Sequence, residues 1–134
     1  MTQVSRIRLP KAVEDQMHGA LRKALADLRT EEEVGEFLED LLTPTEKIML
    51  GKRLAIAILL DKGYDQRTIH SIMKVSVTTV SSVNYWLKQR GKGYRRVIDK
   101  MKSQEQWKQF THELGKFLED YFTVHGQLRK LRKF

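Results

Sequence analysis

The sequence predicts an all-α protein, a helical bundle that contains a helix-turn-helix, and three observations carry this prediction. Proline, which interrupts helices, occurs only at Pro10 and Pro44 in the 134 residues. Apolar residues make up 40% of the chain and recur at helical spacing in successive segments. Several of these segments also begin with a side chain suited to capping a helix. We therefore expect residues 1–134 to form a single helical domain with one core.

Three segments fill the first half of this domain. Residues 10–29 form an amphipathic helix, since Val13, Met17, Leu21 and Leu25 recur on one face. The next helix covers residues 30–42 and opens with a capping box in which Thr30 pairs with Glu33. A third starts at TPTE, residues 43–46, with threonine at the N-cap, proline in the first helical position and glutamate completing another box. It should run to Gly63.

The second half of this third helix is apolar on every side. The stretch LAIAILL, residues 54–60, has no polar residue, so it must be surrounded by other apolar groups. Two arrangements satisfy this requirement: an interface between two subunits, or a central helix within one subunit. The same stretch is far shorter than the roughly 20 apolar residues of a membrane span.

Residues 65–88 are the candidate helix-turn-helix. Residues 66–73 and 77–87 each show helical apolar spacing, and the three residues between them are too few for a loop. Asp65 and Ser76 precede the two helices, where a short side-chain oxygen accepts from the free N–H groups of the first turn. Lys74 stands where many such motifs have glycine, so it either adopts positive φ at a cost of about 1 kcal/mol or the turn has another shape.

After the motif, residues 89–93 end the helix and residues 94–101 form a short basic one. A C-terminal extension helix of about residues 103–128 follows, with Ser103 and Gln106 as a further candidate capping box. Its buried face is expected to carry Trp107, Phe110, Leu114, Phe117, Leu118, Tyr121 and Phe122.

Charge is concentrated on and after the motif. The net charge is +8 with a pI near 9.8, which favours a polyanionic partner. Between residues 66 and 102 Asp99 is the only acid, against nine basic residues: Arg67, Lys74, Lys88, Arg90, Lys92, Arg95, Arg96, Lys100 and Lys102.

Helix-turn-helix proteins read DNA with the second helix in the major groove. Here Val80, Val83 and Leu87 should face the core, which leaves mainly hydroxyl groups pointing outward. No Arg, Asn or Gln stands on the first turns of this helix, so strong bidentate base readout is not expected. The candidate DNA contacts are Gln66, Arg67, His70, Lys74, Val77, Thr78, Thr79, Ser81, Ser82, Lys88, Arg90 and Lys92. The cations Lys74, Lys88, Arg90, Lys92, Arg95 and Arg96 suit phosphates. Any sequence preference is then modest, or comes from Gln66, Arg67 and His70 and from DNA shape. A solvated basic face over two core helices is the alternative.

Other chemistry is not expected. The chain has no cysteine, which excludes thiol chemistry and fits a cytoplasmic protein. Its histidines, His18, His70, His112 and His125, lack metal-ligand spacing, so we expect no metal or cofactor. Because no nucleophile, base and orienting group come together, we do not expect an enzyme.

These residues carry a family resemblance over about residues 37–95. The stretch LLTPTEKIMLGKRLAIAILL, the D-Q-R helix start, SVTTVSSVNYWLK and the G-K-G-Y turn resemble the Trp repressor superfamily, in the branch lacking the full tryptophan pocket. The resemblance implies an interwoven, all-helical homodimer that binds operator DNA, with the apolar third helix covered by the dimer mate.

The same resemblance implies that the ligand pocket is degenerate. Thr43 and Arg53 match two pocket residues, whereas Ser82 stands where the family has a second clamping arginine and Trp86 where it has serine. Val83 replaces a neighbouring glycine as well. The protein is therefore expected not to bind L-tryptophan, and any small-molecule effector is unknown.

The sequence thus predicts a homodimeric, cytoplasmic regulator of transcription, a repressor by resemblance, that binds double-stranded DNA. The alternative is a homodimeric protein-interaction adaptor whose DNA-binding motif is vestigial and whose last helix docks a partner. RNA is a weaker option, because a rigid helix fits B-form grooves better than A-form ones.

Overall fold

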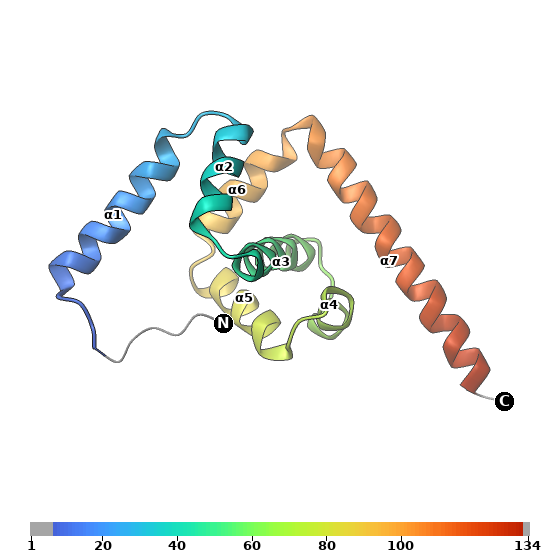
Figure 1. Ribbon diagram of the computed structural model, residues 1–134. Helices are drawn as coiled ribbons and strands as arrows, with labels where there is room; N and C mark the ends of the chain where they lie inside the picture. Colours follow the sequence, from blue (N-terminus) through green and yellow to red (C-terminus); the bar gives the residue numbers. More distant parts are fainter. Residues whose placement is uncertain (1–6, 133–134) are drawn as a thin grey trace. The chain divides into compact units, whose positions relative to one another are not determined.

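The chain is helical throughout the part that the structure describes. The computed structural model describes residues 7–132, with side chains described as far as residue 123. Within this range it contains no strand, which confirms the all-α prediction (Figure 1). The helices are α1 (Lys11–Asp27), α2 (Glu31–Leu41), α3 (Pro44–Asp61), α4 (Gln66–Met73), α5 (Val77–Gln89), α6 (Lys92–Lys102) and α7 (Glu105–Arg132). Over the described residues, no helix has the length and hydropathy of a membrane span.

Two compact units make up the chain, Met1–Gly51 and Lys52–Phe134, and α3 runs across the boundary between them. In the N-terminal unit neither α1 nor α2 contains a buried residue. The apolar stripe of α1 is instead open to solvent, with Val13, Met17, Leu21 and Leu25 each 41–52% exposed. A stripe of this kind normally packs against another apolar surface.

The predicted caps of the N-terminal unit are largely present. At α3 both halves of the box form: the Glu46 N–H donates to the Thr43 hydroxyl at 3.1 Å, and the Thr43 N–H donates to the Glu46 carboxylate at 2.9 Å. At α2 the Glu33 N–H donates to the Thr30 hydroxyl at 3.1 Å. The Glu33 carboxylate, however, accepts from the N–H of Arg29, one residue before the predicted donor.

The core of the C-terminal unit is the apolar half of α3. Ile56, Ala57, Ile58 and Leu59 are fully buried. They form one cluster with buried side chains from all the later helices: Ile69, Ile72, Val80, Val83, Ile98 and Leu118. Of the two arrangements that the sequence leaves open, the central helix within one subunit is therefore the one observed. The implied cover from a dimer mate is not needed for these residues, because α4 to α7 supply the apolar surface.

The end of α3 is held by α6 and α7. The ammonium of Lys102 donates to the Asp61 carboxylate at 2.9 Å, and this hydrogen bond raises the pKa of Lys102. The Lys62 ammonium lies 5.9 Å from the centre of the Trp107 ring. The predicted box at Ser103 is wrong, because the Ser103 hydroxyl donates to the Lys100 carbonyl and so completes the end of α6.

Candidate nucleic-acid interface

Helices α4 and α5, with the three residues between them, form the predicted helix-turn-helix. Both caps are present: the Thr68 N–H donates to the Asp65 carboxylate at 2.8 Å, and the Thr79 N–H donates to the Ser76 hydroxyl at 3.1 Å. The bond from the Thr68 N–H, followed by that from its hydroxyl, lowers the pKa of Asp65. Each helix therefore starts at the residue after its cap.

The turn between the helices is closed by backbone conformation and by one histidine. Lys74 has φ 56° and ψ 47°, the left-handed conformation, and among the described residues it is the only non-glycine with positive φ. Lys74 thus adopts positive φ, which was one of the two shapes expected for this turn. His70, half-buried in α4, donates from Nδ1 to the Val75 carbonyl across the turn. This contact links α4 to the start of α5.

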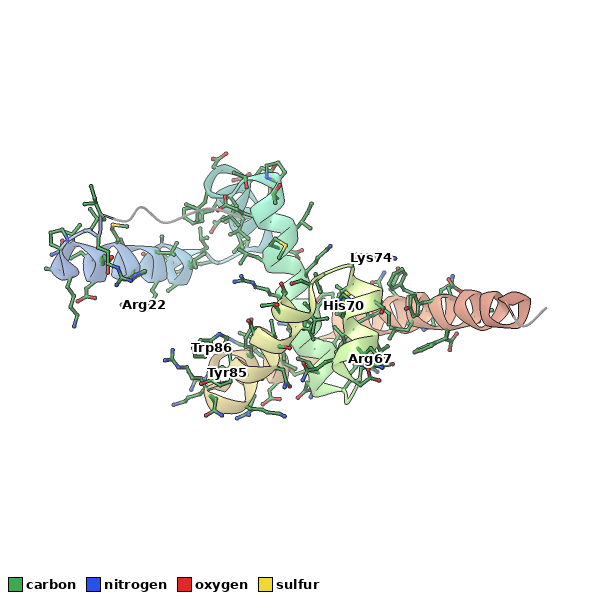
Figure 2. All side chains as sticks on the ribbon, turned by 90° about the horizontal axis from the view of Figure 1, so that it is seen from below. Arg22, Arg67, His70, Lys74, Tyr85 and Trp86 are labelled. Atoms are coloured by element: carbon green, nitrogen blue, oxygen red, sulfur yellow. The ribbon has the colours of Figure 1, made fainter. Side chains whose placement is uncertain are left out.

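Small hydroxyl residues form part of the outward surface of α5. Val80 and Val83 are buried against the core, whereas Thr78, Ser81 and Ser82 are exposed. Figure 2 is seen from the side on which α4 and α5 lie, with Arg67 and His70 labelled on α4, Lys74 in the turn after it, and Tyr85 and Trp86 on α5. The candidate surface therefore includes exposed residues of both helices and of the turn.

Three of the sequence-predicted contact residues also hold this surface together. The Ser81 hydroxyl donates to the side-chain oxygen of Gln66 at 3.2 Å, which joins the start of α4 to the middle of α5. The hydroxyls of Ser76 and Thr79 lie 2.9 Å apart, so the half-buried Thr79 hydroxyl belongs to the cap of α5. Gln66, Thr79 and Ser81 are therefore positioned by contacts within the motif itself.

Exposed cations stand on α4, in the turn, at the end of α5 and at the start of α6. Val77 is 56% exposed at the start of α5. The predicted phosphate ligands Lys74, Lys88, Arg90 and Lys92 are all exposed, and so is Arg67, which was expected to contribute to sequence preference. Arg95, also expected at a phosphate, instead donates to the Leu87 carbonyl at 2.8 Å and closes the end of α5.

The junction of α5 and α6 depends on a glycine. Gly91 has φ 57°, and a Cβ there would lie 2.2 Å from the Leu87 carbonyl oxygen. No other residue fits this position without moving the backbone. The junction places the Arg90 guanidinium 4.6 Å from the centre of the Trp86 ring, where cation and ring attract each other.

One exposed residue of this surface is absent from the sequence-based set. Tyr85 is 55% exposed and lines a shallow hollow of α5 together with Thr78, Ser81 and Ser82. The signal was available, because residues 78, 81, 82 and 85 are spaced at one helical turn and share a face. The predicted contacts on α5 are mostly small hydroxyl residues and cations, so the aromatic Tyr85 is not among them.

The four residues that the resemblance assigns to a degenerate effector pocket fall in both units. Thr43 lies in the N-terminal unit, where it caps α3. Arg53, Ser82 and Trp86 lie in the C-terminal unit and are exposed, Trp86 by 44%. Ser82 and Trp86 line the same shallow hollow of α5.

The fold and this surface define a helix-turn-helix protein. The sequence model of the family described as Trp repressor protein matches residues 16–102, well over half of the chain. The chain belongs to this family. Its match ends with α6, so α7 lies outside it. Neither the curated proteins nor the solved structures contain a match to the chain.

Proposed function

We propose that the protein is a homodimeric transcriptional regulator, acting as a repressor, that binds duplex DNA through α4 and α5. Membership of the Trp repressor family suggests a DNA-binding regulator, not an enzyme. The observation that carries the proposal is the surface of the helix-turn-helix, with hydroxyl groups along α5 and exposed cations around them. Base edges meet short polar side chains in this arrangement, and phosphates meet Lys and Arg.

The exposed stripe of α1 supports the homodimer. Four large apolar side chains on one helix lie open in a single chain, and α2 buries none of its residues. A second copy offers the same stripe, so two copies remove both from water. Two recognition helices then enter successive major grooves about 34 Å apart.

The candidate effector positions support regulation that is independent of tryptophan. A carboxylate ligand needs cationic groups around it, and Ser82 cannot supply the positive charge of an arginine. The Arg90 guanidinium already lies over the indole ring of Trp86. Occupancy of the operator is then set by protein concentration or by another signal.

Duplex binding at increasing salt tests the proposal. If a dimer neutralises about six phosphates, the affinity falls roughly a thousandfold between 50 and 200 mM salt. Arg67→Ala should weaken binding, and Arg22→Ala provides the control, since it removes the same charge from an exposed position on α1. Affinity that barely responds to salt, or equal losses in the two variants, would contradict DNA binding through this surface.

The adaptor function remains the second candidate because of α7. Phe110, Phe117 and Phe122 are 39–52% exposed on a helix that the family match does not include. An adaptor with a vestigial motif keeps its protein partner when Arg67 is replaced by alanine and shows no salt-dependent duplex binding. The same titration therefore separates the two functions.

A further inference from the structure

The outward surface of α5 is hollowed at its centre. Val77, Thr78, Ser81, Ser82, Tyr85 and Trp86 line this hollow, and none of them carries a formal charge. Thr78, Ser81 and Ser82 have short side chains, whereas Tyr85 and Trp86 have large rings that are 55% and 44% exposed. Small side chains flanked by large ones leave room for a group that projects from a binding partner.

The aromatic end of the hollow is held by its own contacts. The rings of Tyr85 and Trp86 meet edge to face, with centres 5.2 Å apart and planes at 74°. The Arg90 guanidinium lies over the Trp86 ring at 4.6 Å. Aromatic pairs and cation–π contacts of this kind each restrict the rings they join. The aromatic end therefore keeps its shape when a partner approaches.

The chemistry of the hollow selects among the groups of a major groove. The inference rests on the proposed function, in which α5 enters that groove. Guanine and adenine are read best by Arg, Lys, Asn or Gln, and the hollow contains none of these. The apolar group that the groove presents is the C5-methyl of thymine, next to the O4 acceptor. A hydroxyl donor beside an apolar wall complements both parts of that base edge.

We propose that the hollow of α5 receives a thymine methyl group and that Tyr85, which lines the hollow, makes the protein specific for thymine at one position of each half-site. The exposed cations of α4 and α5, Arg67 and Lys88 among them, remain available for phosphates. Sequence preference then comes from the uncharged centre of the surface, and most of the affinity comes from its charged border.

Replacing thymine by uracil tests this proposal, because uracil pairs identically and lacks only the methyl group. The preferred duplex is selected from a random pool with the full-length protein and remade with single thymine-to-uracil substitutions. Loss of one buried methyl should weaken binding about fourfold per half-site. Substitution at the same position of both half-sites should weaken binding of the dimer by about fifteenfold. Uracil at the other thymine positions should have little effect on binding.

The Tyr85→Ala variant links the methyl to the tyrosine. It should bind the thymine duplex more weakly and bind the thymine and uracil duplexes with nearly equal affinity. Phe117→Ala is the matched control, since it removes an aromatic side chain of similar exposure, 50%, from α7. That variant should keep the full difference between the two duplexes.

The outcomes separate this inference from the proposed function. Salt-dependent duplex binding that is insensitive to every uracil substitution overturns the thymine contact and leaves DNA binding intact. A Tyr85→Ala variant that still distinguishes thymine from uracil overturns the role of Tyr85. No duplex binding at all overturns the proposed function itself, and tighter binding to the single strand overturns both.

Discussion

Replacing Lys74 by glycine should stabilise the protein and weaken its DNA binding at the same time. Lys74 has φ 56° and ψ 47°, where a Cβ crowds the following carbonyl and costs roughly 1–2 kcal/mol. Glycine removes this strain, but its greater conformational freedom favours the unfolded chain by about 0.5–1 kcal/mol. The net stabilisation is then about 1 kcal/mol, equivalent to a rise in Tm of about 3–5 °C.

The Lys74→Ala variant is the matched control for that substitution. It removes the same charge but keeps the Cβ, so its stability should stay near that of the wild type. Both variants lose one proposed phosphate contact in each subunit, so in a dimer the slope of log affinity against log salt should fall by about 1.8.

Chemical denaturation and salt-dependent duplex binding measure the two effects separately. Equal stability of the glycine and alanine variants would refute the strain at Lys74. An unchanged salt slope in both variants would refute its contact with phosphate. Because the two readouts depend on different properties of one residue, either conclusion can fail without the other.

Three further predictions concern other positions. Gly91→Ala should destabilise the protein by about 1–3 kcal/mol in urea titrations, because the new Cβ meets the Leu87 carbonyl. Gly93→Ala is the control and should be neutral or stabilising, because a Cβ there has nothing within 4 Å. Equal effects of the two substitutions would count against this explanation. Folding lowers the pKa of the Asp65 carboxyl, so the cap stabilises α4 fully at pH values above the ordinary pKa of about 3.8. This contribution is lost as the pH falls through the lower pKa of the folded state. Asp65→Asn keeps a capping oxygen that does not titrate, so its melting temperature should depend less on pH in this acid range, and an unchanged dependence would argue against the cap. Isothermal calorimetry should show no saturable binding of L-tryptophan, whereas micromolar affinity would contradict the loss of the clamping charge at Ser82.

Local signals predicted most of the elements. The predicted bounds of α4, residues 66–73, are those observed, and the TPTE start of α3 forms both hydrogen bonds of its capping box. Such signals succeed because a cap involves residues only three apart, so the sequence alone contains both partners. At Ser103 the same reasoning failed, since its hydroxyl had an equally near acceptor in the last turn of α6.

Contacts made by long exposed side chains were harder to predict. The exposed Arg95 was expected at a phosphate, yet its guanidinium completes α5 through the Leu87 carbonyl. Tyr85 was overlooked, because its importance depends on the small residues one turn earlier and on the Trp86 ring beside it. Neither relationship follows from residue type or charge.

By itself, the sequence determined that the chain is helical, where its helices begin, and that a capped helix-turn-helix lies within a basic region. These properties depend on backbone propensity, on caps and on apolar spacing, all of which act over a few residues. Only the tertiary structure decided that Ile56 to Leu59 are covered within one chain, and that α5 presents an uncharged hollow ending at Tyr85. Both depend on which surfaces pack together, because burial and shape belong to groups of side chains brought close by the fold.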